Sequence, residues 1–351
     1  MKLRDYKNVH CIGIGGIGLS ALARYCNAVG ASVAGSDGGI SRITEDLQKE
    51  GIKVYFGHNQ AHLSSEADLI IYSIAVDENN PELQAARTKE IKCLSYPEAL
   101  GLLTLEYTTI AICGTHGKTT TTAMVTSMLK NAGKNPTVIV GSLLKEGGTN
   151  FIQGDSEYLV VEACEYKRSF LNLHPTHILV TNIDEDHLDY YKDLADIQSA
   201  FQSFADLLPE SGSLITHNDV SLITKAIKVN ADTYDRDTIS LSVLGEHNKS
   251  NAQLALALSN VLGLDETLAR KGLELFTGTW RRLEYKGTHK GGVFYDDYGH
   301  HPTEIKATLQ ALRERYPSNK FKLFVIFQPH LYSRTKLLLN EFSESFSLAD
   351  T

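Results

Sequence analysis

Short apolar runs alternate with amphipathic stretches along most of this chain. The runs that predict buried strands are VHCIGIG (9–15), SVAGSD (32–37), ADLIIYS (67–73), TTIAIC (108–113), PTVIVG (136–141), YLVVEAC (158–164), HILVTNI (177–183) and SLITHND (213–219). Strands that alternate with helical patterns in this way are typical of parallel sheets connected by crossover helices. The pattern therefore predicts an α/β fold.

Breaks in this pattern divide the chain. The first α/β series is interrupted at residues 92–101 (KCLSYPEALG), and the second ends after two helical stretches, 251–263 and 266–276. Two further strands are predicted in the remainder (292–297 and 321–327), with a helix at 302–316 and a last helix. A chain of 351 residues is too long for one ordinary core.

We therefore predict three domains. They are a Rossmann-like N-terminal domain (1–103), a central domain with a P-loop ATPase-type parallel sheet (104–277) and a partial Rossmann-like C-terminal domain (278–351). An α/β domain usually needs about 100 residues or more to close its core. We expect the third domain to be incomplete.

Composition excludes several classes of partner. The formal net charge is -8 and no dense Lys/Arg block is present, which argues against duplex nucleic acid and anionic membranes. The five cysteines form no C-x-x-C pair, and the histidine pairs His174/His177 and His58/His62 have no cysteine or carboxylate companions, so no structural zinc site is predicted. Because a strand begins within ten residues and no apolar run reaches about 20 residues, we expect a cytoplasmic protein.

The stretch CGTHGKTTTTA (113–123) lies between a predicted strand and a predicted helix. Glycines at such a turn let backbone N–H groups face an anion at the helix N-terminus. Lys118 adds a positive charge for phosphate, and the hydroxyl of Thr119 is a ligand for Mg²⁺. The strict Walker spacing is absent, since Ile112 stands where its first glycine is expected. The alternative is a structural turn with a capping threonine, but the strand–turn–helix context favours a nucleotide.

A second glycine-rich loop, G-x-G-x-x-G, follows the first strand. Gly13, Gly15 and Gly18 form the pattern, and Asp37 ends the next strand. Alone, this weak fingerprint predicts NAD, with Asp37 on a ribose hydroxyl, or a purely structural turn. A chain that also has a P-loop is better explained by two different nucleotides.

Acids and a histidine follow later strands of the second series. Glu162 and Glu165 end one strand, and Asp186 and His187 follow another together with Asn182 and Asp189. The carboxyl ends of parallel strands meet at one edge, where ligands bind. A carboxylate and an imidazole there can hold a magnesium ion that bridges ATP phosphates, although any one of these residues alone is more typical of a solvated loop.

Six ordered motifs resemble the Mur ligases, from about residue 8 to the last residue. They are GTHGKTTTT (114–122), TNIDEDHLD (181–189), GEHNKSNA (245–252), RRLE (281–284), DDYGHHPTE (296–304) and FQPHLYSRT (327–335). Within the family, GIGGIGLS (13–20), GSD (35–37) and YGHHP (298–302) are most similar to the branch that joins L-alanine to UDP-N-acetylmuramate. One departure is EACEYKR (162–168), where the family commonly has E-A-D-E-S-D.

The resemblance implies a set of site residues. For the UDP-sugar they are Gly13, Gly15, Gly16, Ile17, Gly18, Ser36, Asp37 and His58. For ATP they are Gly114, Thr115, His116, Gly117, Lys118, Thr119, Thr120, His247, Asn248, Asn251, Arg281, Asp297 and Tyr298. For Mg²⁺, or Mn²⁺ as a substitute, they are Thr119, Glu162 and His187. The catalytic set is Lys118, His300, His330 and Arg334. The HNKSNA segment is also explained by a helix start with an asparagine N-cap.

The implied reaction is ATP-dependent amide formation through an acyl phosphate in peptidoglycan precursor synthesis, by a monomer or homodimer. His300 is a candidate base for the amine of L-alanine, or it orients the carboxylate. The short third domain leads us to expect little activity from this chain. The alternatives are a recycling ligase that adds a whole peptide to UDP-N-acetylmuramate, a non-catalytic UDP-sugar-binding module and an NAD-dependent oxidoreductase.

Overall fold

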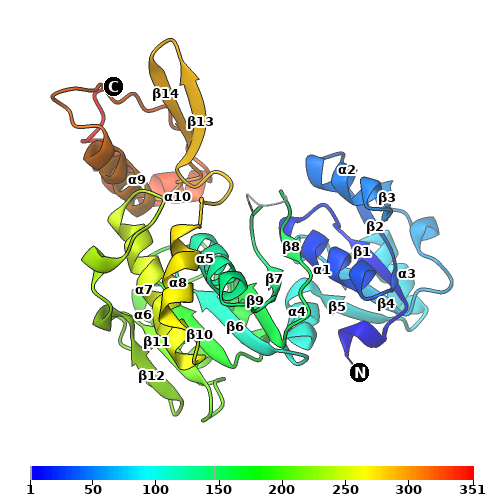
Figure 1. Cartoon of the computed structure of the whole chain (residues 1–351). Helices are drawn as coiled ribbons and strands as arrows, with labels where there is room; N and C mark the ends of the chain where they lie inside the picture. Colours follow the sequence, from blue (N-terminus) through cyan, green and yellow to red (C-terminus); the bar gives the residue numbers. More distant parts are fainter. Residues whose placement is uncertain (1, 145–147) are drawn as a thin grey trace.

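The computed structural model describes residues 2–144 and 148–351 and begins with a parallel five-stranded sheet in the order β3-β2-β1-β4-β5 (Figure 1). Its elements are β1 (Asn8–Ile12), α1 (Ile17–Ala28), β2 (Ser32–Asp37), α2 (Arg42–Lys49), β3 (Lys53–Phe56), β4 (Leu69–Tyr72), α3 (Pro81–Thr88), β5 (Lys92–Ser95) and α4 (Tyr96–Thr104). This is the order of five of the six strands of the Rossmann sheet (3-2-1-4-5-6), so the Rossmann-like prediction for this domain is confirmed.

The break predicted at residues 92–101 is wrong, because this segment forms β5 and then α4. Ser95 and Glu98 start the helix: the N–H and the hydroxyl of Ser95 both donate to the Glu98 carboxylate, at 2.7 and 2.6 Å. Pro97 lies in the first helical turn, where its missing N–H costs nothing. The proline therefore marks a helix start and not an interruption of the fold.

The central domain contains a seven-stranded sheet in the order β12-β11-β10-β6-β9-β7-β8, parallel except for β8. Its strands are β6 (Thr108–Cys113), β7 (Thr137–Ile139), β8 (Phe151–Ile152), β9 (Tyr158–Glu162), β10 (His177–Val180), β11 (Ser213–Thr216) and β12 (Ile227–Asn230). Its helices are α5 (Lys118–Asn131), α6 (Leu194–Ala205), α7 (Glu246–Val261) and α8 (Glu266–Glu274). The predicted α/β class with a P-loop-type sheet is confirmed.

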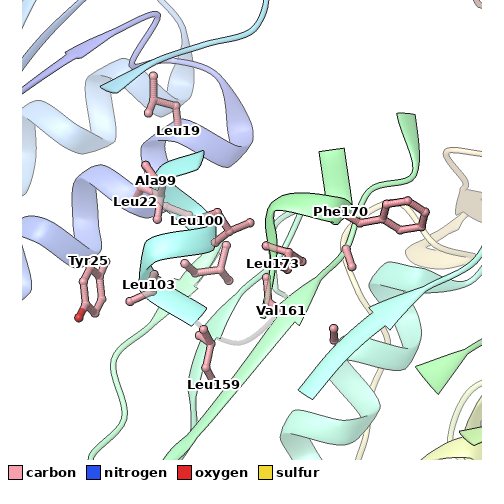
Figure 2. Packing of buried hydrophobic residues seen from close by; sticks show 14 of the residues in the cluster. Leu19, Leu22, Tyr25, Ala99, Leu100, Leu103, Leu159, Val161, Phe170 and Leu173 are labelled. Carbon is pink, nitrogen blue, oxygen red and sulfur yellow. The ribbon is translucent and has the colours of Figure 1, made fainter. Parts of the chain in front are cut away.

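The apolar core runs without interruption from the first domain into the second. Leu100 and Leu103 of α4 belong to the same buried cluster as Leu22 of α1 and Leu159 of β9 (Figure 2). A Cβ on Gly101 would lie 2.2 Å from the carbonyl oxygen of Asn172, so α4 packs closely against the central domain. The seam between the first two domains is therefore a packed interface.

The last part of the chain contains a two-stranded antiparallel sheet and three helices. They are β13 (Glu284–His289), β14 (Gly292–Asp296), α9 (Pro302–Arg315), α10 (Tyr332–Leu337) and α11 (Leu339–Glu344). In Figure 1 this hairpin projects away from the central domain. Among the described residues, no helix is long and apolar enough to cross a membrane.

The strand predicted at residues 321–327 is not formed. Its side chains still alternate, since Leu323, Val325 and Phe327 pack on the α9 cluster while Phe324 and Ile326 face outward. Its backbone pairs with the last two residues, since the N–H of Val325 donates to the carbonyl oxygen of Thr351 and the N–H of Asp350 donates to that of Leu323, both at 2.8 Å. Among the described residues no strand lies beside the segment, and two such bonds do not make a ladder. The apolar run that predicted a strand therefore lies half-buried on α9 without forming a strand.

Candidate active site

The P-loop connects β6 to α5 through two glycines that have no room for a side chain. A Cβ on Gly114 would lie 1.9 Å from the hydroxyl oxygen of Thr181, and one on Gly117 would lie 2.9 Å from Asn251 Oδ1. Both glycines have positive φ, +135° and +83°. Only glycine combines this backbone geometry with such close neighbours. The shortened motif thus forms a tight loop at the start of α5.

The backbone amides of residues 117–120 are the candidate donors to an anion. Those of the two preceding residues are already used, because the N–H groups of Thr115 and His116 donate to Asn182, at 3.1 and 2.9 Å. Within residues 2–144 and 148–351, the N–H groups of residues 117–120 have no protein acceptor. They lie at the N-terminus of a 14-residue helix, whose dipole favours negative charge. The amides at the helix start are therefore the ones available to phosphate.

Lys118 binds a buried carboxylate. Its Nζ donates to Glu165 Oε1 at 2.9 Å, and also to the carbonyl oxygens of Gly114 and Thr115 at 2.5 and 3.1 Å. Burial lowers the pKa of Lys118, but the negative charge of Glu165 and its acidic neighbours outweighs burial and raises this pKa above the usual value. Lys118 is therefore a full positive charge beside the loop.

The candidate metal ligands are only partly assembled. Thr119 Oγ1 donates to both oxygens of Glu162, at 3.1 and 3.2 Å, and Glu162 Oε2 also accepts the N–H of Gly141 at 2.8 Å. His187 Nε2 lies 3.7 Å from Glu165 Oε1. Hydroxyl and carboxylate oxygens are the ligands that Mg²⁺ prefers, and Glu165 Oε2 is buried without a hydrogen-bond partner among the residues that the structure describes. The donor set of this site fits a magnesium ion.

A cavity of about 830 Å³ lies between the central and third domains. It contains these residues predicted for ATP: His116, Gly117, Thr119, Thr120, His247, Asn248, Asn251 and Asp297. Gly114, Thr115, Lys118, Arg281 and Tyr298 do not line it. Arg281 instead binds Asp296 at 3.1 Å and stacks on Trp280 and Tyr298, while its neighbour Arg282 lines the cavity. The size suits a nucleotide, since small-ligand sites usually measure about 300–1,000 Å³.

Three consecutive residues after β10 hold the third domain. Asp184 Oδ2 accepts from the Thr303 hydroxyl at 3.0 Å, and the carbonyl oxygen of Glu185 lies 3.0 Å from His301 Nε2. Asp186 Oδ1 accepts from Nη2 and Nε of Arg334, at 3.0 and 3.2 Å, and both side chains are buried. Arg334, predicted to hold an acyl phosphate, is therefore paired with a carboxylate in this conformation.

His300 and His330 lie near each other in the third domain, with ring centroids 6.5 Å apart. His300 Nδ1 lies 2.9 Å from the carbonyl oxygen of Tyr298, so Nδ1 carries the proton and Nε2 is left as the acceptor. Burial lowers the pKa of His300, although Glu304 acts in the opposite direction. A neutral imidazole with a free acceptor nitrogen is the state that a general base requires.

A second cavity, of about 670 Å³, lies over the glycine-rich loop of the first domain. The predicted residues that line it are Gly13, Gly15, Gly16, Asp37 and His58. Three do not: Ser36 is buried, and its hydroxyl lies 3.0 Å from His58 Nδ1, while Ile17 and Gly18 begin α1. A Cβ on Gly18 would lie 2.6 Å from the ring of Tyr96. The third glycine therefore serves the packing of α1 on α4.

Several residues in or beside the first cavity were not predicted as site residues. Glu304 and Arg282 belong to motifs that carried the resemblance, so the motif letters were a usable signal. Asp184 belongs to another such motif and binds both His116 and Thr303. Glu165 was noted only as a strand-end acid. Its pairing with Lys118, 47 positions away, has no signal in the local pattern.

Comparisons with known proteins agree with this layout. Residues 8–108 match the Mur ligase family catalytic domain, 112–237 the Mur ligase middle domain and 281–351 the Mur ligase glutamate ligase domain. The chain is 42% identical to the UDP-N-acetylmuramate--L-alanine ligase of Caldicellulosiruptor bescii, over 97% of this chain and 81% of the relative. It is 41% identical to the enzyme of that name from Clostridium tetani, over 99% and 83%.

Solved structures give the same result. The crystal structure of UDP-N-acetylmuramate-alanine ligase from Thermotoga maritima has a TM-score of 0.81 and 29% identity, over 98% of this chain and 84% of that one. The murein peptide ligase from Psychrobacter arcticus, at 24% identity and a TM-score of 0.75, shares the fold. The chain belongs to the Mur ligase family.

Proposed function

We propose that this protein joins L-alanine to UDP-N-acetylmuramate at the cost of ATP, forming an amide for peptidoglycan precursor synthesis. The observation that carries the proposal is the pair of separate cavities. One is built on the P-loop and the other on the glycine-rich loop of the first domain. Relatives about 40% identical over nearly the whole chain carry the name of this activity.

The ATP site is assigned to the larger cavity. The amides of residues 117–120 and the Lys118 amino group are the donors for phosphate, while His247, Asn248 and Asn251 line the part formed by α7. The UDP-sugar is assigned to the cavity over Gly13 to Gly16. Asp37 accepts the N–H of Gly15 at 2.8 Å, so this carboxylate shapes the loop as well as facing the ligand.

Amide formation from a carboxylate and an amine needs an activated carboxylate. The lactyl carboxylate attacks the γ-phosphorus of ATP, the bond to the β–γ bridging oxygen breaks, and ADP and an acyl phosphate result. Lys118 neutralises charge on the transferred group. Thr119, Glu162 and His187 would hold a magnesium ion, which when bound neutralises phosphate charge; Glu165 is a further oxygen donor nearby.

In the second step the neutral amine of L-alanine attacks the acyl carbonyl, and phosphate leaves from the tetrahedral intermediate. His300 Nε2 is positioned as an acceptor for a proton of the attacking amine. Arg334 is assigned to the oxyanion, a role for which it must leave Asp186. A donor of this kind lowers the barrier by about 3–4 kcal/mol. We place the reaction in the cytoplasm, where ATP and nucleotide sugars are available, and assign it to a monomer or homodimer.

The experiment is phosphate release by the purified chain with ATP, Mg²⁺ and UDP-N-acetylmuramate, with L-alanine, other amino acids or a peptide as acceptor. Release that depends on both UDP-N-acetylmuramate and L-alanine supports the proposal. A preference for the peptide indicates the recycling ligase. Tight UDP-sugar binding without phosphate release indicates a binding module, and a change in nicotinamide absorbance indicates an oxidoreductase.

A further inference from the structure

Glu304, in the first turn of α9, lies between two cations from different parts of the chain. Its Oε1 is 3.4 Å from His116 Nδ1 of the P-loop and 3.5 Å from Arg282 Nη1 of the segment before β13. Its Oε2 accepts the N–H of His300 at 3.0 Å. The side chain is 13% exposed. Every oxygen of this carboxylate is thus used by a group in or beside the ATP cavity.

His116 is held from both domains. On the side opposite Glu304, its Nε2 lies 3.3 Å from Asp184 Oδ2 of the central domain. The other charged or titratable groups near the ring are Lys118, which opposes a positive charge on it, and His301, whose ring centroid is 4.8 Å away. An imidazole between two carboxylates, one from each domain, is charged and fixed in orientation.

His301 does not complete a metal site with these groups. The nearest ligand atoms of His116, Asp184 and His301 lie within 4.8 Å of one another. However, His301 Nε2 faces the carbonyl oxygen of Glu185 at 3.0 Å, and its Nδ1 accepts the N–H of Thr303 at 3.3 Å. Both ring nitrogens therefore anchor the start of α9, and the ion pairs of His116 explain the cluster without a cation.

We propose that Glu304 is a positioning residue that holds His116 and Arg282 in place at the ATP cavity and thereby couples nucleotide binding to the seating of the third domain. This inference rests on the proposed ATP site. All three side chains line the cavity, and the pairs they form join the P-loop to α9. Without the carboxylate, the two cations repel each other and α9 loses its charged contact with the P-loop.

The test measures binding of a non-hydrolysable ATP analogue in the presence of Mg²⁺. Calorimetry gives the affinity, and the fluorescence of Trp280, the only tryptophan of the chain, is recorded in the same titration. Trp280 lies between α8 and β13, and its backbone N–H donates to the carbonyl oxygen of Leu143. Its emission therefore reports on the junction with the third domain. The variant is Glu304→Gln, which keeps the shape and removes the charge. Glu314→Gln is the matched control, because it removes the same charge from an exposed position of α9.

We expect Glu304→Gln to weaken analogue binding about tenfold, the usual size of a lost charge-assisted contact. The Trp280 response should shrink, and KM for ATP should rise while kcat changes by less than about threefold. Glu304→Asp should recover part of the affinity, and Glu314→Gln should bind like the wild type. Wild-type-like binding by Glu304→Gln overturns the inference alone. Absence of binding by the wild type overturns the ATP site as well.

A double-mutant cycle identifies the partner. If Glu304 acts through His116, adding His116→Asn to Glu304→Gln weakens binding no further than the worse single variant. Additive losses overturn the coupling. Thermal unfolding of each variant is measured alongside. If Glu304→Gln fails to fold, the cycle is run with Glu304→Asp, and affinities equal to the wild type in both Glu304→Asp and His116→Asn overturn the proposal.

Discussion

The amino group of Lys118 lies 2.9 Å from Oε1 of Glu165, and the second oxygen of that carboxylate is buried without a hydrogen-bond partner among the described residues. The side chain of Glu165 is 3% exposed. The P-loop lysine is thus neutralised by a protein carboxylate in a place where phosphate charge is expected. Stability and catalysis therefore depend on the same pair for different reasons.

Lys118→Ala should abolish ATP turnover, leave UDP-sugar binding intact and lower the free energy of unfolding by about 3 kcal/mol or more, since it leaves Glu165 buried and unpaired. Adding Glu165→Gln should restore most of the stability but none of the turnover. Urea unfolding and phosphate release measure the two effects separately. ATP hydrolysis by Lys118→Ala at the wild-type rate would show that the P-loop assignment is wrong.

The sequence pattern was sufficient to predict the P-loop residues but not the residues that they contact. Lys118 and Thr119 were predicted to bind phosphate and metal because a glycine turn before a helix dictates that geometry locally. Glu165 and Asp186 were noted as acids at strand ends, but their partners Lys118 and Arg334 come from other segments. Such pairs depend on how the domains pack, which no local pattern contains.

The two errors in the fold have different causes: one is a missed local signal and the other a missing neighbouring strand. Residues 92–101 were predicted as a break, although Ser95 and Glu98 form the start of a helix. Residues 321–327 were predicted as a strand because they form a short apolar run. Alternate side chains of the run are packed on the α9 cluster, but a ladder requires a neighbouring strand, which an apolar run alone does not supply.

His116 should make stability depend on pH in the alkaline range. Burial lowers its pKa, but Asp184 and Glu304 outweigh burial and raise it from 6.5 to about 9. A histidine with a raised pKa contributes stability that is complete below its unfolded value and is lost as pH rises through the folded value. The difference between the two pKa values corresponds to about 3 kcal/mol of unfolding free energy. The unfolding free energy should therefore fall between about pH 6.5 and 9.

The measurement is urea unfolding across this range for the wild type and His116→Asn. His300 and His301 have lowered pKa values from burial and act in the opposite direction at lower pH, so the difference between the two proteins isolates His116. His289→Asn, at an exposed position of β13, is the matched control. An identical pH slope with and without His116 would contradict the prediction.

Gly15→Ala should weaken UDP-N-acetylmuramate binding by at least about tenfold, the change expected when about 1.4 kcal/mol is lost. The added Cβ would lie 2.8 Å from Asp37 Oδ2 and 2.9 Å from Thr44 Cγ2, so Asp37 must leave the N–H of Gly15. Asp37→Ala should have the same effect, and neither change should alter ATP binding. Titration calorimetry with each nucleotide measures both affinities.

Gly39→Ala is the control for Gly15→Ala, because its Cβ meets nothing within 4 Å. Normal UDP-sugar binding by Gly15→Ala would rule out the loop as the site.

Asp186→Asn should loosen the third domain. Arg334 donates twice to Asp186 Oδ1, and the two side chains are only 8% and 10% exposed, so the variant leaves a buried guanidinium without its counter-charge. Removing one partner of a buried ion pair should lower the free energy of unfolding by about 3 kcal/mol. Limited proteolysis should cut the third domain faster in Asp186→Asn than in Asp189→Asn, which removes a carboxylate from an exposed position of the same loop. Equal cleavage of the two variants would mean that the Asp186–Arg334 pair does not hold the third domain in place. Arg334 would then bind the acyl phosphate without first having to break an ion pair that the domain needs.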